Sequence, residues 1–107
     1  MPASKNVLET KRKNGVLRLK PLDHLVASNV DAQRMSLMKA LEACESPVVL
    51  DLSASQQVDS LGITLVLGLF KSCQRAGIAF SVVGVNQDVL RVFKLFNLQK
   101  FFAILES

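Results

Sequence analysis

The period of hydrophobic and polar positions changes along the chain, and each change marks an expected element. From residue 48 the chain reads VVLDL, a short apolar run, and a polar loop and an apolar segment over 61–76 follow. A short continuous apolar run is typical of a strand buried on both faces. The longer segment has apolar residues on nearly every helical face. It therefore predicts a helix that packs deep against a sheet and ends at Gly77.

The residues before this stretch predict a hairpin. Asn14-Gly15 separates the segments 6–13 and 16–20, and Asn-Gly is the strongest short signal for a two-residue hairpin turn. We expect two antiparallel strands here. A further short extended segment is expected over 22–26.

A helix is predicted after this segment, because capping residues precede a stripe of apolar positions. Ser28 or Asn29 provides the N-cap, and Ser46-Pro47 ends the helix. The stripe has the three- and four-residue spacing of an amphipathic helix and consists of Leu37, Met38, Leu41 and Cys44.

The last part of the chain repeats the order of strand and helix. A buried strand over 78–83 is predicted to run parallel to 48–52 through a right-handed crossover, because one helix separates the two. Asn86 is expected to cap a helix that Asn97 ends, and 101–105 forms a last extended segment. The core stripe of this helix consists of Val89, Val92, Phe93 and Phe96. This element order indicates an α/β fold, a mixed central β-sheet with helices packed on it.

Length and composition narrow the class of protein. The chain of 107 residues is half apolar, which suits one domain over 1–107, with 1–14 as a basic tail and first strand. Cys44 and Cys73 are expected to be reduced core thiols inside helices, without a disulfide framework. No apolar run is long enough to span a membrane and no apolar signal core opens the chain, so we expect a cytoplasmic protein.

The positive charge lies at one end of the chain. The net charge is +4, and residues 1–20 hold six basic side chains against one acidic side chain. Nucleic-acid binding is not expected, because no aromatic residue lies among these charges to stack on bases. A solvated edge hairpin is the simpler explanation, since lysine on an edge strand discourages unwanted pairing.

Few residues of this chain suit catalysis. His24 is the single imidazole, and its neighbour Asp23 is expected to point away from it in an extended segment. Nucleotide and nucleophile motifs are absent from the sequence, and Gly62 and Gly68 do not make a phosphate-binding glycine loop. One histidine without a Cys-x-x-Cys pair gives no metal site. The chain is therefore predicted not to be an enzyme and to hold no cofactor or metal.

Ser60 stands at the start of the apolar helix and allows two interpretations. A serine in this position is most often an N-cap, worth about 1 kcal/mol. Alternatively, a kinase modifies it and places a charge of about −1.5 to −2 at the helix end. The helix dipole would favour the phosphate there and Asp59 would oppose it, so the effect would fall on an interface and not on the fold.

A longer motif includes this serine. The chain reads DLS at 51–53, four further residues, VDSLGI at 58–63, and then the helix closed by Gly77. This arrangement resembles the STAS domain of bacterial anti-sigma factor antagonists. The pattern of that family is an apolar strand ending in Asp-Leu-Ser, a short loop, and an Asp-Ser-Ser/Thr-Gly turn that opens a buried helix. The resemblance covers residues 15 to 105 and implies a STAS-like fold.

The resemblance implies a protein-binding switch. In that family the unphosphorylated domain binds an anti-sigma factor with a GHKL-type kinase fold and thereby releases a sigma factor. This serine kinase phosphorylates the hydroxyl that follows the Asp of the turn, and a phosphatase restores the active form. By position, the acceptor is Ser60, and nucleotide would be bound by the kinase. The expected partner-binding residues are Asp23, Ser53, Asp59, Leu61, Gly62 and Thr64.

The sequence departs from the family pattern at two places, and both touch the expected interface. Leu61 stands where many members have a second hydroxyl, and Lys20-Pro21 precedes Leu22-Asp23 where Gly-Glu is usual. The resemblance also leaves alternatives open: a non-phosphorylated STAS subunit of an ABC-type lipid transporter, or a stressosome-like assembly module. A homodimer is compatible with each of them.

Overall fold

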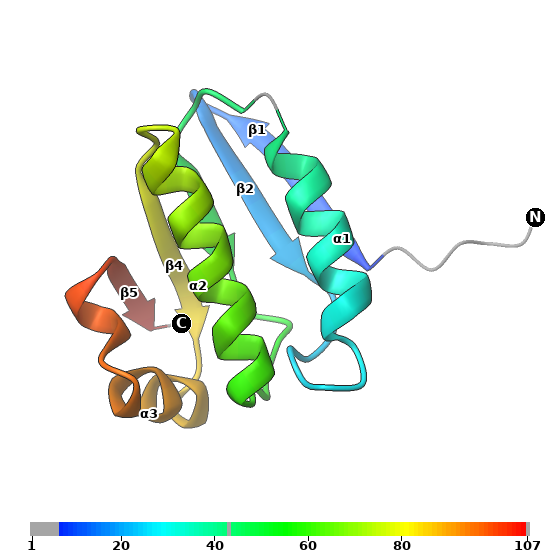
Figure 1. The fold of residues 1–107 in the computed structure, drawn as a ribbon, viewed down its shortest axis with the longest axis vertical. Helices are drawn as coiled ribbons and strands as arrows, with labels where there is room; N and C mark the ends of the chain where they lie inside the picture. Colours follow the sequence, from blue (N-terminus) through cyan, green and yellow to red (C-terminus); the bar gives the residue numbers. More distant parts are fainter. Residues whose placement is uncertain (1–6, 43, 107) are drawn as a thin grey trace, which may run out of the picture.

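A five-stranded sheet forms the centre of the fold in the computed structural model, which describes residues 7–42 and 44–106 (Figure 1). The strands are β1 (Leu8–Lys13), β2 (Val16–Pro21), β3 (Val48–Asp51), β4 (Phe80–Val85) and β5 (Ala103–Glu106). The helices are α1 (Val30–Leu41), α2 (Ser60–Arg75) and α3 (Gln87–Leu95), with a 3-10 helix, η1 (Leu98–Lys100). The strand order is β1-β2-β3-β4-β5; β1 is antiparallel to β2, and the other pairs are parallel. The predicted α/β fold with a mixed sheet is confirmed.

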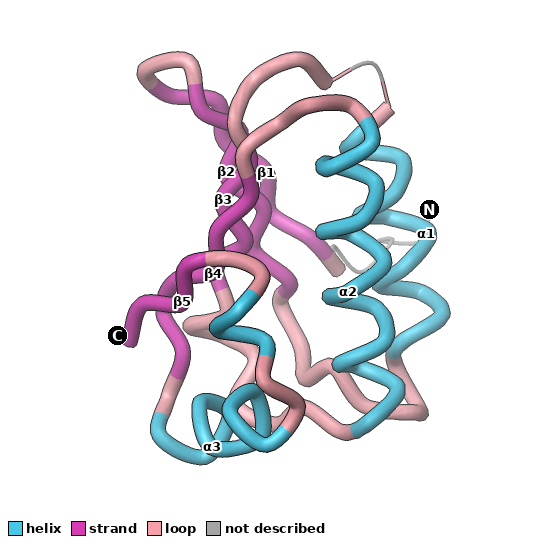
Figure 2. The backbone as a smooth tube through the Cα atoms, turned by 60° about the vertical axis from the view of Figure 1, so that its left-hand side comes forward, coloured by secondary structure: helices cyan, strands magenta, loops and turns pink. Residues whose placement is uncertain are grey.

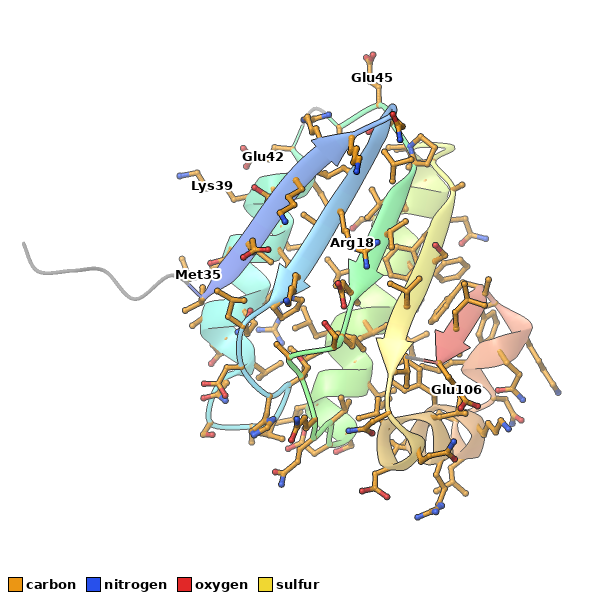
Figure 3. The ribbon with its side chains drawn as sticks, turned by 180° about the vertical axis from the view of Figure 1, so that it is seen from behind. Arg18, Met35, Lys39, Glu42, Glu45 and Glu106 are labelled. Carbon is orange, nitrogen blue, oxygen red and sulfur yellow. The ribbon has the colours of Figure 1, made fainter. Side chains whose placement is uncertain are left out.

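Alternation along the strands gives the sheet one apolar and one polar face. The apolar positions lie in register across three strands and are all buried: Leu17, Val48 and Phe80 in one row, Leu19, Leu50 and Val82 in the next. Helices α1 and α2 lie together on one side of the sheet (Figure 2). The opposite face, which we call the open face, carries Arg18 and faces the viewer in Figure 3.

One prediction about this sheet is wrong. The run over 48–52 was expected to be buried on both faces, but helices cover only one of them. Val49, on the open face, is half-buried, whereas Val48 and Leu50 are fully buried. Asp51 is buried too, although its side chain lies on the open face, because an ion pair covers it.

The predicted hairpin is confirmed. Asn14 and Gly15 have φ angles of 55° and 76°, the two positive values that a type I′ turn requires. The strands pair from Leu8 opposite Pro21 to Lys13 opposite Val16. The first residue of the predicted first strand, at position 6, lies outside the described residues.

The predicted helix after Asn29 ends earlier than expected. α1 ends at Leu41, so Cys44 lies beyond the helix and not on its predicted stripe. Cys44 is nevertheless buried, as expected. Met38 is 40% exposed, and the predicted stripe is wrong at that position. The buried side of α1 consists of Val30, Gln33 and Leu37. Asn29 occupies the N-cap position but makes no capping hydrogen bond with its side chain.

α3 follows its prediction at both ends. Asn86 caps it by accepting a hydrogen bond from the Val89 amide at 2.8 Å, and Asn97 has a φ of 58° just after the helix. Phe93 belongs to the core, but Phe96 is 48% exposed, so the prediction that both phenylalanines are core residues is wrong for Phe96. In the described part of the chain, no helix is both long and apolar enough to cross a membrane.

Candidate functional site

The carboxylate of Asp59 holds the N-terminus of α2. Its Oδ1 accepts hydrogen bonds from the amides of Leu61 and Gly62, each at 3.0 Å, and its Oδ2 accepts one from the amide of Ala27 at 2.8 Å. These bonds lower the pKa of Asp59 below its ordinary value, and the bond from Gly62 has the largest effect, with that from Ala27 second. The prediction that Ser60 is the N-cap is wrong, because Asp59 is the N-cap and Ser60 is the first helical residue.

The side chain of Ser60 is exposed. Its hydroxyl makes no hydrogen bond to any residue within 7–42 and 44–106, while its carbonyl accepts one from Thr64 Oγ1 at 3.0 Å. Because Asp59 already satisfies the first amides of the helix, this hydroxyl is not needed for capping. A free hydroxyl therefore lies on the first turn of α2.

Gly62 lets the start of α2 lie directly against the segment that precedes α1. A Cβ atom on Gly62 would stand 2.0 Å from the Leu25 carbonyl oxygen and 2.9 Å from Val58 Cγ1. Leu25 is fixed from both sides, since its amide donates to the Gln57 carbonyl at 2.9 Å and its carbonyl accepts from the Asp59 amide at 3.2 Å. Only a residue without a side chain fits this contact.

Three loops meet beside this contact. The Ser55 hydroxyl donates to the Asp23 carbonyl at 2.7 Å, and the Gln56 amide donates to His24 Nδ1 at 3.2 Å. Asn86 Nδ2 donates to the Gln56 carbonyl at 3.2 Å. Asp23 uses its carboxylate to accept from the His24 amide at 2.7 Å. The two neighbouring side chains thus make separate contacts, with no carboxylate-imidazole hydrogen bond between them.

The structure brings most of the predicted site residues to one surface. Exposed side chains at or beside the start of α2 are Asp23, Ser60, Leu61 and Thr64, with Asp59 partly exposed among them. Leu61 is 46% exposed, so this surface is partly apolar. Gly62 is buried, and it admits the close contact between α2 and the segment of Leu25.

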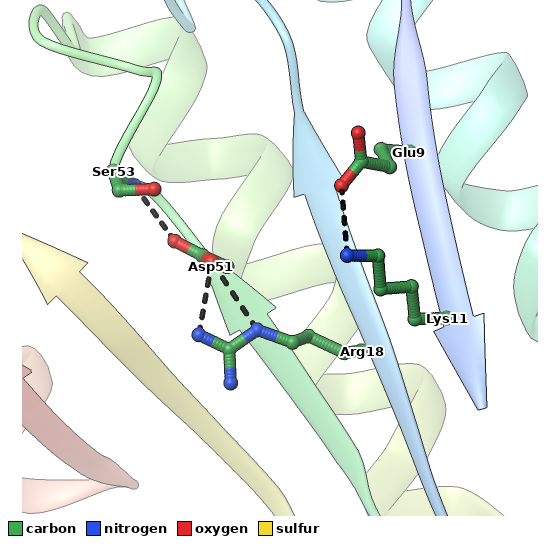
Figure 4. A network of polar contacts seen from close by, with 5 residues as sticks. All are labelled: Glu9, Lys11, Arg18, Asp51 and Ser53. Atoms are coloured by element: carbon green, nitrogen blue, oxygen red, sulfur yellow. Dashed lines mark hydrogen bonds and ion pairs between the residues drawn. The ribbon is translucent and has the colours of Figure 1, made fainter. Parts of the chain in front are cut away.

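Ser53 lies with a second group of residues, on the open face. Its amide donates to Asp51 Oδ1 at 2.9 Å, and Arg18 donates to Asp51 Oδ2 from Nε at 3.2 Å and from Nη2 at 2.9 Å (Figure 4). Burial raises the pKa of Asp51, but the bonds from Ser53 and Arg18 outweigh it and leave this pKa below its ordinary value. A Cβ on Gly84 would stand 2.8 Å from Asp51 Oδ1, so this group is closely packed.

The sequence did not reveal several residues that build the site. Ala27 and Gln56 act through their backbone, and a backbone donor leaves no signal in the sequence. Asp59 could have been recognised as the cap, since Asp and Ser are equally favoured there.

A hollow of about 180 Å³ also adjoins the site and is lined by Gln56, Gln57, Val58, Asp88, Val89 and Val92. The described residues contain no group of three or more histidine, cysteine or acidic side chains placed to hold a metal ion.

A family model and solved structures of similar fold agree on the family of this chain. The model of the STAS domain family matches residues 7–107. A crystal structure of a putative anti-sigma factor antagonist from Thermotoga maritima is similar, with a TM-score of 0.86 and 24% identity, over 95% of this chain and 88% of that chain. An anti-sigma factor antagonist from Mycobacterium paratuberculosis has a TM-score of 0.83 and 18% identity, over 94% and 85% of the two chains.

A third similar structure is the Bacillus cell fate determinant SpoIIAA in its phosphorylated form. It has a TM-score of 0.69 and 14% identity, over 94% of this chain and 91% of that chain. At these identities the likeness establishes the fold. No curated protein shows significant similarity to this chain.

Proposed function

This chain belongs to the STAS domain family, and from that premise we propose that it is an anti-sigma factor antagonist controlled by phosphorylation of Ser60. Unphosphorylated, it binds an anti-sigma factor that is also a serine kinase of the GHKL type. Phosphorylated, it releases that partner, and a phosphatase restores the binding form. The chain itself carries out no reaction and acts by docking.

The observation that carries the proposal is the hydroxyl of Ser60, which is exposed on the first turn of α2 and has no hydrogen bond within the described residues. A kinase needs such access to its acceptor. The neighbouring carboxylate of Asp59 is fixed by three amides, so the backbone around the hydroxyl is held in one geometry. The structure of phosphorylated SpoIIAA, which has the same fold, adds a precedent.

Electrostatics at this turn favours an effect on docking and not on the fold. The amides of Leu61 and Gly62 already donate to Asp59, so a phosphate on Ser60 finds few free donors at the helix end. It would carry about −1.5 to −2 charges beside a carboxylate whose lowered pKa keeps it ionised. The phosphate would therefore stay in water, and a partner could cover it only by removing that hydration.

The surface around Ser60 suits a partner with an apolar contact. Leu61 is exposed there, and Thr64 offers a second hydroxyl one helical turn further along α2. Burying Leu61 favours the unphosphorylated complex, because a partner that covers Leu61 also covers the adjacent Ser60 side chain. Leu61 thus replaces a hydroxyl of the family pattern with an apolar contact of its own.

Phosphorylation can be tested by incubating the purified protein with ATP and cell extract from its source organism. Mass spectrometry then locates any phosphate. We expect one phosphate on the wild type and on Ser28→Ala, a control variant that removes another exposed serine. We expect none on Ser60→Ala.

Docking is tested with the same proteins immobilised. Wild type and Ser60→Ala should retain a GHKL-type kinase, and Ser60→Asp should retain at least tenfold less. If Ser60 stays unmodified while all three proteins retain the same partner equally, the switch does not exist. Equal retention of an ABC-type ATPase by all three would favour the transporter-subunit alternative.

A further inference from the structure

The strand at one edge of the sheet is strongly basic. β1 and β2 together hold five basic side chains and one acidic side chain, Glu9. All residues from Glu9 to Lys13 are exposed. Within the described residues, β1 pairs only with β2, so its outer edge offers unpaired backbone donors and acceptors.

The strand register places alternate cations on the open face. Lys11 lies opposite Arg18, and Lys13 lies opposite Val16. A hollow of about 290 Å³ lies among these side chains and has no acidic residue in its lining, which consists of Lys11, Lys13, Asn14, Val16 and Arg18. Glu9 and Asp51 line a smaller neighbouring hollow of about 110 Å³. The positive charge thus increases along β1 towards the hairpin turn.

The lysines supply the charge that remains free in this hollow. Arg18 is paired with Asp51 by two hydrogen bonds, which fix its guanidinium and neutralise much of its charge (Figure 4). The Lys11 amine lies 3.7 Å from Glu9 Oε1, an exposed pair of little strength. Lys13 makes no ion pair within the part of the chain that the structure describes.

We propose that the outer edge of β1 docks an acidic, extended segment of a partner protein, which adds a strand to the sheet. Side chains on one face of a strand repeat every two residues, about 6.6–6.8 Å. A segment with an acidic residue at every second position therefore places these residues opposite Lys11 and Lys13, with Cβ atoms about 4.5–5.5 Å apart across the strands. The backbone bonds supply affinity, and the lysines select the acidic sequence.

Charge also decides which occupant the edge accepts. A second copy of β1 that pairs parallel and in register would place Lys11, Arg12 and Lys13 each opposite a like charge, and like charges directly opposite one another are destabilising. The same side chains that prevent pairing with a second copy thus admit a segment of opposite charge. The occupant is therefore a different, acidic protein.

This surface is separate from the proposed switch. Lys13 and Val16 lie at the amino end of β2, whereas Ser60 follows the carboxyl end of the parallel strand β3. In Figure 1 the turn between β1 and β2 and the start of α2 lie at opposite ends of the molecule. Both surfaces can be occupied at once, so the proposal does not depend on phosphorylation.

Fluorescence anisotropy with a labelled ten-residue peptide of alternating Glu and Thr tests this site at about 50 mM salt, where charge contacts are weakly screened. Replacing both lysines, as Lys11→Glu with Lys13→Glu, should weaken binding at least tenfold. Lys71→Glu with Lys100→Glu changes the net charge equally at exposed positions elsewhere and should leave binding nearly unchanged. The neutral pair Lys11→Gln with Lys13→Gln should give an intermediate loss.

A second probe separates strand addition from charge attraction. It has the same sequence with alternate backbone nitrogens methylated, which removes the donors that would face β1, and it should bind at least tenfold more weakly. The proposal is overturned if this probe binds as well as the first, if both charge-reversed proteins lose binding equally, or if the wild type binds neither probe. Ser60→Asp should bind the first probe like the wild type, so this test and that of the switch fail independently.

Discussion

A methyl group at Gly62 should destabilise the protein although Gly62 lies in a helix. The Cβ of alanine would stand 2.0 Å from the Leu25 carbonyl oxygen and 2.9 Å from the Leu25 Cβ. Overpacking costs roughly 1–3 kcal/mol, and we take about 3 because the blocking atom belongs to the backbone. Alanine regains about 1 kcal/mol of helix propensity over glycine. The expected net loss for Gly62→Ala is therefore about 2 kcal/mol.

Gly68 provides a matched control in the same helix. A Cβ at Gly68 has no heavy atom within 4 Å, so Gly68→Ala gains helix propensity without a clash. We expect it to stabilise the protein by roughly 0.5–1 kcal/mol. The two variants should thus differ by about 3 kcal/mol, equivalent to roughly 10 °C or more in Tm for a chain of this size.

Urea and thermal unfolding followed by far-UV circular dichroism measure both effects. Equal stabilisation by the two substitutions would refute the close contact between α2 and the segment of Leu25. A loss at Gly62 should also loosen the Asp59 hydrogen bond to Ala27, because that bond joins the same two segments. Faster hydrogen exchange of the Ala27 amide in Gly62→Ala would show this directly.

Three further measurements test the other contacts. Asp59→Ala should lower Tm more than Asp59→Asn, since asparagine keeps one acceptor oxygen for the helix amides; equal values would argue against the cap. Burial raises the pKa of Asp51, but the bonds from Ser53 and Arg18 lower it by more, so the folded pKa lies below the unfolded pKa of about 3.9. The contribution of Asp51 to the free energy of unfolding is therefore complete above the unfolded pKa and is lost as the pH falls through the folded pKa. Asp51→Asn should flatten this acid dependence in urea unfolding between pH 2 and 6, and an unchanged slope would contradict the assignment. Burial, with a smaller contribution from Cys44, raises the pKa of Cys73 to about 11, so Ellman's reagent at pH 8 should react with Cys73 only after unfolding, and rapid reaction of the native protein would count against its burial.

The features that the sequence predicted correctly depend on neighbouring residues. Asn14-Gly15 specifies its turn through two positive φ angles, and Asn86 and Asn97 mark the ends of α3 through local backbone geometry. Such signals act over two to four residues, so no knowledge of the tertiary fold is needed. Periodicity indicated element type for the same reason, and the parallel pairing of β3 with β4 followed from the rule for strands joined by one helix.

The features that the sequence did not predict depend on distant residues. Asp59 meets Ala27 across 32 positions, and Arg18 meets Asp51 across 33. An apolar strand looks the same whether helices cover one face or two, so the half-buried state of Val49 was not predictable from its neighbours. The open face of the sheet, and with it the basic hollow on β1 and β2, depends on which side of the sheet the helices cover. The sequence did not specify that side.

The structure removes the capping interpretation of Ser60, because Asp59 and not Ser60 is the N-cap of α2. A serine that caps a helix commits its oxygen to the amides of the first turn, and such a hydroxyl would have to give up that bond when modified. Here Asp59 makes those bonds, one residue earlier. Because the cap lies one position earlier, the Ser60 hydroxyl is not committed to a capping bond. A substitution or modification there leaves the capping bonds intact, which is the property that a docking switch on a stable helix requires.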